Sequence, residues 1–312
     1  MCYADKGRYR YCEKCNRKCD EIIGSGQLLL VPVESQKVEV ENTEEGTTDI
    51  YYAPDQSSYY SLFQQIYYEG NSMESIFELQ FATDNLNPFY SFMSSSRGVI
   101  GAKTEHVYLN IFPPLGDEAY RSEYFDIRAK ICLSKSYLWK YIGVEPNGSE
   151  RAQEEYTNNF IIYRLAEIYL MKAEALTQMA IMDGDNQELL KEAYAMVKVI
   201  RDRSAAVNTT EIGQTEGSYS GKAMEEFVLA ERARELIFEG KRWFDVLRQA
   251  KRNNYEGDNI NYLMTLAEYS APASKVNSLK AKYRNYHSHY LPIYSEEVDA
   301  NPLLQQNEFY AN

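Results

Sequence analysis

Residues 229–248, LAERARELIFEGKRWFDVLR, decide the fold of this chain. Charged and large apolar side chains are interleaved so closely in this stretch that a helix cannot keep every charge in water. A buried charge without a partner is too costly to persist, so some of these charges must be paired away from solvent. The stretch therefore predicts helices held together by ion pairs that do not touch a ligand. The side chains expected to form these pairs are Glu231, Arg234, Glu235, Glu239, Arg242 and Arg248.

The charged letters of this stretch also have a catalytic interpretation. Glu231 and Glu235 lie one helical turn apart, and a pair of carboxylates can hydrolyse a glycan. Arg232 and Arg234 are interleaved with them, however, which is typical of an ion-paired helix interface. The sequence has only three histidines, and it suggests no Ser/His/Asp or Cys/His arrangement. We therefore predict that the protein is not an enzyme and uses no cofactor.

The composition argues against nucleic acid as a partner and favours a surface on which sugars stack. The net charge is −13, and the sequence has no tract rich in lysine and arginine. An acidic surface repels a phosphate backbone, so we expect no nucleic acid as a partner. Aromatic residues make up 13% of the chain, with 28 tyrosines against 2 tryptophans. Tyrosine suits a wet surface on which sugar rings stack, although packing between helices is the commoner role of any single tyrosine.

Three cysteines, Cys12, Cys15 and Cys19, have a spacing that allows two interpretations. Their order is compatible with a metal or iron–sulfur motif. The same spacing, continued by Ile22 and Ile23, places all five side chains on one face of a helix. Because the sequence offers no second pair of ligands, we favour buried cysteines on a helical core stripe and predict no metal site.

Apolar periodicity predicts several helices. One is expected over residues 8–23. A second is expected from Asn159 to about Met182, and the letters DGDNQE (183–188) then turn the chain into a third. Small residues at the expected contacts make this antiparallel pair similar to a tetratricopeptide repeat. A further helix is expected over 223–239.

The sequence after this helix predicts less regular structure. Gly240 is expected to end or kink the helix before a short continuation to about Ala250. Residues 253–290 are polar, rich in tyrosine and without clear periodicity, so we expect them to be irregular.

The first half of the chain predicts short elements separated by loops. The acidic segment 34–58 is interpreted as a loop or an insertion, and residues 59–68 are apolar at helical spacing. The letters IFELQF alternate Phe77 and Leu79 with Glu78, which predicts a half-buried strand.

Short motifs in the second half carry a family resemblance. They are RLAE at 164–167, KAEA at 172–175, RDRSA at 201–205, the block from Glu231 to Asp245, LPI at 291–293 and the tail from Asn301 to Tyr310. With these motifs the chain resembles the SusD/RagB family, the nutrient-binding lipoproteins of the Bacteroidetes cell surface. It departs from the family pattern at Tyr294, where proline is usual. The match is good from about residue 60 onward and weak over 1–30.

The resemblance implies a mainly α fold, namely a tetratricopeptide-like helical scaffold with long irregular loops and a few short strands. It implies a single SusD-like domain over 1–312, which lacks an N-terminal part because family members are markedly longer. Within it we expect a residual N-terminal helix in 1–30, a loop-rich, ligand-facing region in 59–155 and a helical C-terminal region in 156–312.

The function that the resemblance implies is non-catalytic capture of an oligosaccharide at the outer membrane, on the cell surface. The captured sugar would pass to a SusC-like TonB-dependent transporter, over which the binding protein sits as a lid. The alternative is a tetratricopeptide-like scaffold that binds a protein or a peptide.

The segment 85–112 is our candidate for part of the ligand site. It is irregular and rich in aromatic residues, and irregular loops on a rigid scaffold often carry binding sites. Its aromatic side chains are expected to stack on sugar rings, and its polar ones to hydrogen-bond sugar hydroxyls. Packing within the loop explains each residue equally well. The residues expected to contact the ligand are Asn87, Phe89, Tyr90, Phe92 and Arg97.

Overall fold

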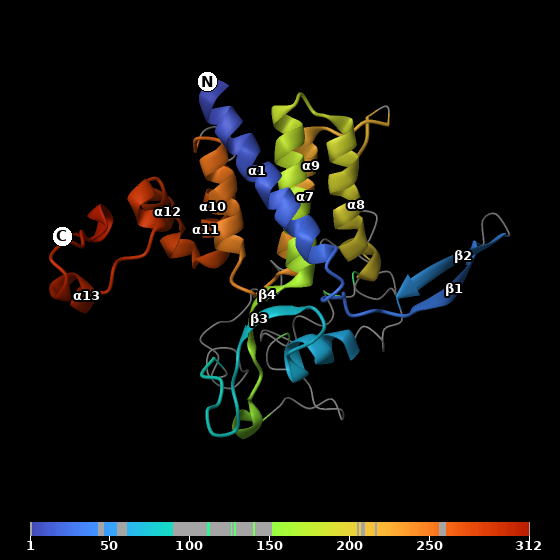
Figure 1. The fold of residues 1–312 in the computed structure, drawn as a ribbon, viewed down its shortest axis with the longest axis horizontal. Coiled ribbons are helices and arrows are strands. Elements are labelled where there is room, and N and C mark those ends of the chain that lie inside the picture. The colour runs from blue at the N-terminus through green and yellow to red at the C-terminus, as the bar shows by residue number, and fades with distance from the viewer. Residues whose placement is uncertain are drawn as a thin grey trace. The chain divides into compact units, whose positions relative to one another are not determined.

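The computed structural model divides into two compact units, Met1–Gly240 and Lys241–Asn312. Both units consist mainly of helices, as the sequence predicts (Figure 1). None of the helices within the described ranges is both long and apolar enough to cross a membrane. The residues that the structure describes are 2–42, 47–54, 61–89, 111–112, 126, 128, 140, 152–204, 206, 210–215, 217–255 and 260–311.

Four long helices form the scaffold of the first unit. Helix α7 lies at the centre of this group and packs against the other three. The core between α7, α8 and α9 is made of buried aliphatic and aromatic side chains such as Leu170, Leu176 and Val197. Burying such side chains is the main stabilising term in folding. The four helices are α1 (Cys2–Ile23), α7 (Leu165–Met182), α8 (Gln187–Arg203) and α9 (Gly221–Glu235).

Helices α7 and α8 form the antiparallel pair that the sequence predicts. The chain turns after Met182, and the Asn186 side chain caps α8 by accepting hydrogen bonds from two backbone N–H groups of its first turn. Ala166, Ala173 and Ala193 are fully buried in the core, where small side chains let helices approach closely.

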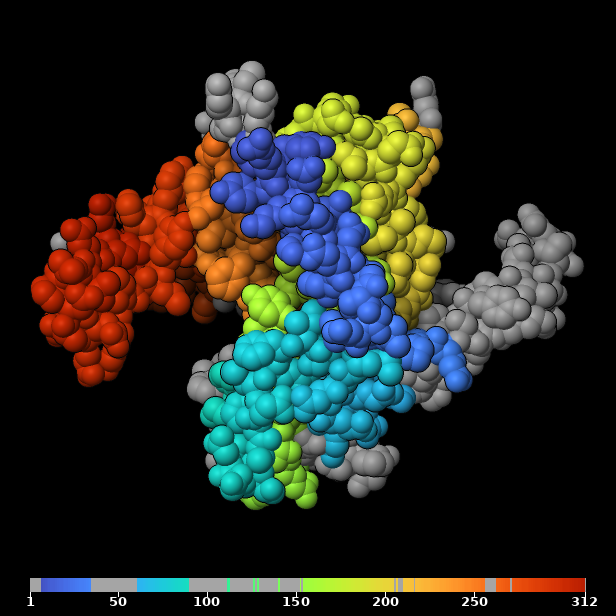
Figure 2. All heavy atoms as spheres, viewed as in Figure 1, coloured from blue at the N-terminus to red at the C-terminus, as the bar shows by residue number. Residues whose placement is uncertain are grey.

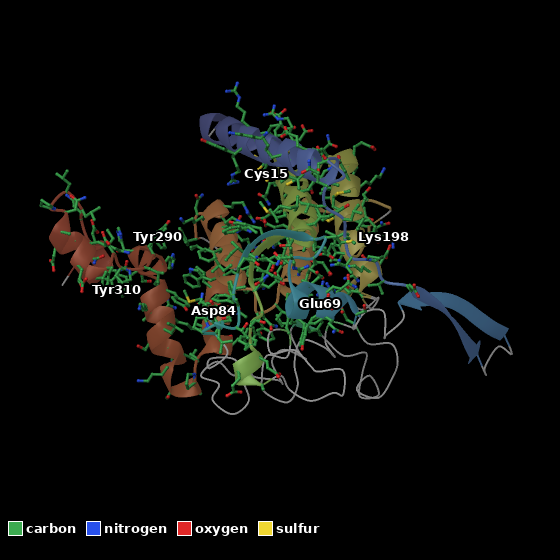
Figure 3. The ribbon with its side chains drawn as sticks, turned by 60° about the horizontal axis from the view of Figure 1, so that its bottom comes forward. Cys15, Glu69, Asp84, Lys198, Tyr290 and Tyr310 are labelled. Atoms are coloured by element: carbon green, nitrogen blue, oxygen red, sulfur yellow. The ribbon has the colours of Figure 1, made fainter. Side chains whose placement is uncertain are left out.

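Helix α1 packs against α7 and forms part of the surface of the unit (Figure 2). The Lys172 ammonium of α7 lies 2.6 Å from the Asp20 carboxylate of α1 and 2.8 Å from the Glu192 carboxylate of α8, which ties three helices together. Cys19 is buried and Cys15 is partly buried in a small apolar cluster, in agreement with the expected core stripe (Figure 3).

The segment 34–58 was expected to be a loop or an insertion, but the structure shows two strands in it. Strands β1 (Ser35–Asn42) and β2 (Thr47–Pro54) pair antiparallel, with Ser35 opposite Pro54. Val38 and Val40 alternate with charged letters in β1, which is the period of a strand, but the polar content of the segment conceals this alternation.

A second two-stranded sheet joins distant parts of the first unit. Strand β3 (Ser75–Leu79) confirms the expected strand, and it pairs antiparallel with β4 (Phe160–Arg164). The helix expected from Asn159 therefore begins only at Leu165. The first four residues of FIIYR are β-branched or aromatic, and the strand continues directly into the helix, so the apolar spacing of the strand merges with that of α7. The N–H of Leu165 donates to the carbonyl of Glu74, 2.8 Å away, which joins the two elements.

The buried face of β3 is the reverse of what the apolar alternation suggests. Glu78 is buried, whereas Phe77 and Leu79 are exposed. The Glu78 carboxylate accepts hydrogen bonds from the N–H of Asn71 at 2.9 Å and from the amide of Asn159 at 2.8 Å. These two hydrogen bonds compensate for hydrogen bonds to water that the carboxylate loses when it is buried.

Residues 61–69 form helical turns, as their spacing predicts, and the last six of them, Gln64–Glu69, have π-helical hydrogen bonding. Leu62, Ile66 and Tyr67 are buried there against Val31. A short 3-10 turn, Gln153–Glu155, precedes β4.

Residues 253–290 of the second unit were expected to be irregular, but the structure shows helices there. Helices α11 (Ile260–Ser270) and α12 (Ala273–Tyr283) lie in this range, after α10 (Arg242–Arg252). Leu263, Met264 and Ala267 are buried at helical spacing, a pattern that the surrounding asparagines, serines and tyrosines conceal. The remaining elements are short: the 3-10 turns Tyr286–His289 and Glu308–Tyr310, and the helix α13 (Ser295–Ala300).

Candidate functional site

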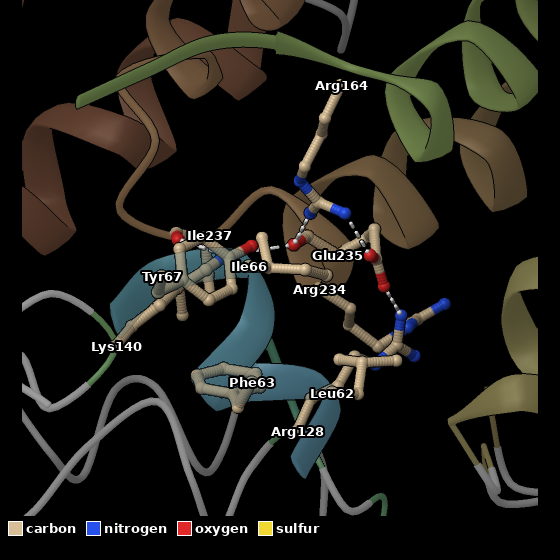
Figure 4. Close-up of a pocket in the computed structure, with 10 residues that line it drawn as sticks. All are labelled: Leu62, Phe63, Ile66, Tyr67, Arg128, Lys140, Arg164, Arg234, Glu235 and Ile237. Atoms are coloured by element: carbon tan, nitrogen blue, oxygen red, sulfur yellow. Dashed lines mark hydrogen bonds and ion pairs between the residues drawn. The ribbon is translucent and has the colours of Figure 1, made fainter. Parts of the chain in front are cut away.

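The most concentrated group of charges in the described residues surrounds the C-terminal end of α9. We call this group the charged cluster. Three glutamates, Glu231, Glu235 and Glu239, follow one another at helical spacing, and each is at most 5% exposed. Five of the cations that face them, some of which Figure 4 shows around Glu235, come from sequence-distant segments, and Arg234 comes from α9 itself. These cations are Arg128, Lys140, Arg164, Arg201, Arg203 and Arg234.

Glu235 lies at the centre of the charged cluster and contacts three guanidinium groups. Its carboxylate accepts from Arg164 at 2.7 Å, from Arg203 at 2.9 Å and from Arg128 at 3.1 Å. Arg164 comes from the end of β4 and Arg203 from the end of α8. The ion pairs therefore connect a strand and two helices, as the interleaved charges of the sequence predict.

Glu239 is held on the opposite side of Arg164. Its carboxylate accepts from Arg164 at 2.8 Å, from the Lys140 ammonium at 2.6 Å and from the Tyr67 hydroxyl at 2.8 Å. Lys140 also donates to the carbonyls of Glu235 and Ile237, each 3.0 Å away. These carbonyls have no partner within α9, so Lys140 caps the end of the helix.

Glu231 completes the row of carboxylates. It lies 2.7 Å from Arg128, 3.0 Å from Arg201 and 2.9 Å from Arg234. Arg234 is one helical turn further along α9, so this pair stabilises the orientation of Glu231 within its own helix.

The cations keep all three carboxylates ionised. Burial by itself would raise the pKa of Glu231, but Arg128, Arg234 and Arg201 lower this pKa to about 2. Burial opposes Arg164 and Lys140 in the same way at Glu239, where the pKa is also about 2. At Glu235 the guanidinium groups again prevail over burial, and its pKa lies well below the usual range.

This arrangement does not suit acid–base catalysis. A general acid needs a raised pKa to hold its proton near neutral pH, whereas these glutamates have lowered pKa values. The small cavity beside them, lined by Tyr67, Arg164 and Glu235 among others, has room for about one water molecule (Figure 4). Within the described ranges, no three His, Cys, Asp or Glu side chains are grouped as a metal site requires. The lowered pKa values and the ion pairs are those expected of a structural framework, and the prediction that the charged cluster does not touch a ligand stays a prediction.

We expect Arg234→Ala to lower the melting temperature by several degrees. The substitution removes one of the cations that compensate the buried charge of Glu231, and each kcal/mol lost corresponds to roughly 2–4 °C in a domain of 150–250 residues. Differential scanning calorimetry at pH 7 measures the shift. An unchanged melting temperature would show that this pair does not stabilise the fold.

Comparison with known proteins identifies the family. The model of the SusD family matches residues 133–310, which is more than half of the chain. The chain belongs to the SusD family. Proteins of this family are non-catalytic binding proteins, and homologues include surface glycan-binding proteins.

Three relatives illustrate how far the similarity extends. A SusD-like protein of Formosa agariphila is 35% identical over 95 residues, 30% of this chain and 17% of the relative. A SusD homologue of Bacteroides thetaiotaomicron has a TM-score of 0.56 and 18% identity over 98% of this chain and 56% of its own. Surface glycan-binding protein A of the same species, in complex with laminarihexaose, has a TM-score of 0.50 and 20% identity over 98% of this chain and 62% of its own. The chain thus spans less than two thirds of the length of each.

The residues that we predict to contact the ligand lie partly within the described SusD fold. The buried Asn87 amide donates to the carbonyl of Asn158 at 2.7 Å, and its oxygen accepts from the N–H of Phe89 at 2.9 Å. The ring of Phe89 lies 5.0 Å from that of Phe160 in β4. Tyr90, Phe92 and Arg97 lie outside the described residues. The role of all five in ligand binding stays a prediction.

The sequence did not indicate several members of the charged cluster. Arg128 and Lys140 lie far in sequence from the segment 229–248, and both are buried. Arg164 was noted only within the family motif RLAE. In the second unit, Arg248 pairs with Asp245 of its own helix at 2.7 Å.

Proposed function

We propose that this protein is a non-catalytic, surface-exposed binder of oligosaccharides. The match to the SusD family over 133–310 carries this proposal. The relative described as surface glycan-binding protein A, in complex with laminarihexaose, supports a glycan as the ligand. The geometry of the charged cluster agrees, because its carboxylates are saturated by cations and leave no reactive pair. Recognition must then depend on other residues.

We propose the segment 85–112 as part of the ligand site. Sugars bind through stacking on aromatic rings and through hydrogen bonds from planar polar side chains. The base of this segment is held by the hydrogen bonds of Asn87 and by the packing of Phe89 on Phe160. A rigid base supports a binding segment because less conformational entropy is lost on binding. Tyr90, Phe92 and Arg97 follow directly and are the proposed contacts.

A second part of the proposal concerns the transfer of the captured sugar to a transporter. We propose that the captured sugar passes to a SusC-like TonB-dependent transporter in the outer membrane. The support is the family membership of the chain. Co-purification of the tagged chain with the transporter encoded beside it tests this step, and a transporter that never co-purifies would refute it.

We expect Tyr90→Ala to weaken glycan binding about threefold to tenfold. One aromatic contact contributes roughly 0.5–1.5 kcal/mol, and 1.4 kcal/mol corresponds to a factor of ten in affinity. A glycan array that includes laminarihexaose first identifies a bound oligosaccharide, and isothermal titration calorimetry then compares the variants.

The matched control for this experiment is Tyr11→Ala, because Tyr11 is 77% exposed on α1 and far in sequence from the segment 85–112. It should bind like the unmodified chain. Unchanged affinity in Tyr90→Ala would refute the assignment of this site. Binding of a peptide library, with no response on the glycan array, would favour the peptide scaffold instead.

A further inference from the structure

The second unit contains an aromatic cluster that the proposed function does not use. It surrounds His289, which is buried and lies 5.5 Å from the ring of Tyr255, 5.9 Å from that of Tyr286 and 6.0 Å from that of Trp243. Burial lowers the pKa of His289 below its usual value, so its ring is neutral at pH 7 and packs among the others without an unpaired charge. Tyr283 closes the cluster from the end of α12, with its ring 5.2 Å from that of Trp243.

Two tyrosines of this cluster form a stacked pair at its outer edge. The ring centroids of Tyr255 and Tyr286 are 4.1 Å apart, and the ring planes differ by 18°. Tyr286 is 49% exposed, so half of its surface remains open to solvent although Tyr255 stacks on the ring. The pair is therefore a flat aromatic surface with a rigid backing.

The backbone behind Tyr255 is strained in a way that fixes its ring. Asn254 and Tyr255 have φ angles of +52° and +56°, a region that bulky side chains rarely adopt. The N–H of Tyr255 donates to the carbonyl of Ala250 at 2.8 Å, which closes the turn after α10. Such strain persists where the surrounding structure imposes it, and it is frequent at binding sites.

Polar groups lie in the same short segment as Tyr286. Tyr290 is 51% exposed, and its hydroxyl accepts a hydrogen bond from Lys251 of α10. The Asn307 amide donates to the carbonyl of His287 at 2.7 Å and to that of Tyr290 at 3.3 Å, which holds the turn in place. The exposed ring of Tyr286 can stack on a sugar, and the hydroxyl and ammonium groups of this unit can hydrogen-bond to one.

We propose that Tyr286, backed by Tyr255, forms a stacking platform for a pyranose ring of an oligosaccharide. This inference rests on the proposed function and adds a second contact, built within the C-terminal unit alone. The exposed members of the cluster are tyrosines with polar tips, which fits a hydrated sugar better than an apolar protein surface.

The test uses the whole chain and oligosaccharides of two to six units from several series, including laminarihexaose. Calorimetry compares the unmodified chain with Tyr286→Ala and Tyr286→Phe. We expect Tyr286→Ala to weaken binding of the oligosaccharide at this platform about threefold to tenfold. Tyr286→Phe keeps the ring and should bind within about twofold of the unmodified chain, because only the hydroxyl is lost.

Three controls make each outcome decisive. Tyr294→Ala removes a tyrosine of the same unit that is 62% exposed and lies outside the cluster, and it should leave affinity unchanged. A thermal melt of Tyr286→Ala excludes loss of folding as the cause, and Tyr286→Leu, which keeps the apolar bulk, should show the same loss of affinity. Unchanged affinity in Tyr286→Ala, while Tyr90→Ala binds weakly, would overturn the platform alone. A chain that binds none of the glycans would overturn both the platform and the proposed function.

Discussion

Arg164→Ala should destabilise the first unit by about 3–5 kcal/mol, the cost of breaking a buried ion pair by removing one partner. The guanidinium of Arg164 contacts both Glu235, at 2.7 Å, and Glu239, at 2.8 Å, and it also donates to the carbonyl of Glu235 at 2.9 Å. Its removal leaves two buried carboxylates with fewer cations. The free energy of unfolding, from urea denaturation followed by circular dichroism, measures the loss.

The matched control is an ion pair of the same unit that lies in solvent. Lys198 and Asp202 are 2.6 Å apart on α8, and their side chains are 53% and 61% exposed. Lys198→Ala should therefore cost no more than about 0.5 kcal/mol. Arg164→Lys keeps one charge but loses the fork that reaches both glutamates, and it should fall between the two variants. Equal stability of Arg164→Ala and Lys198→Ala would contradict the structural role of the charged cluster.

Acid should remove a large part of the stability of the first unit between about pH 5 and pH 2. The pKa values of Glu231 and Glu239 are about 2 in the folded protein, whereas a glutamate in an unfolded chain has a pKa of about 4.3. The folded state thus binds fewer protons than the unfolded state in this range, and stability falls as pH falls. The contribution is fully present above about pH 5 and is lost as the pH approaches the folded pKa values.

A single substitution separates the charged cluster from the other carboxylates of the chain. Glu235→Gln removes one of the three lowered pKa values, so this variant should be less stable at pH 7 and should lose less stability between pH 5 and pH 2. Melting temperatures of both proteins across this range give the two slopes. Parallel curves would show that Glu235 does not contribute to the acid sensitivity.

Local periodicity explains which parts of this fold the sequence could predict. Helices α7 and α8 were expected because their apolar residues repeat at helical spacing and an Asn-capped turn separates them. Strand β4 was missed because its apolar letters run without a break into α7. Helix α11 was missed because asparagines, serines and tyrosines surround its buried Leu263, Met264 and Ala267. Helix α12 was missed because it has no buried side chain that could mark a face. In each case the decisive contact is tertiary, and no local pattern records it.

Only the part of the charged cluster that lies in the segment 229–248 was predictable from the sequence. The interleaved charges around Glu235 required partners, and that requirement follows from the cost of burying a charge. Arg128 and Lys140 approach Glu235 across roughly a hundred residues of sequence. Which cation meets which carboxylate depends on how distant segments pack, which a single sequence does not specify.

The position of a bound oligosaccharide in a crystal structure tests the central claim most directly. The claim is that buried ion pairs form a passive framework and that aromatic residues elsewhere recognise the ligand. We predict sugar rings stacked on the aromatic side chains of the segment 85–112, with none in the small cavity beside Glu235. A sugar seated between Glu235 and Glu239, with a water molecule poised between their carboxylates, would contradict it.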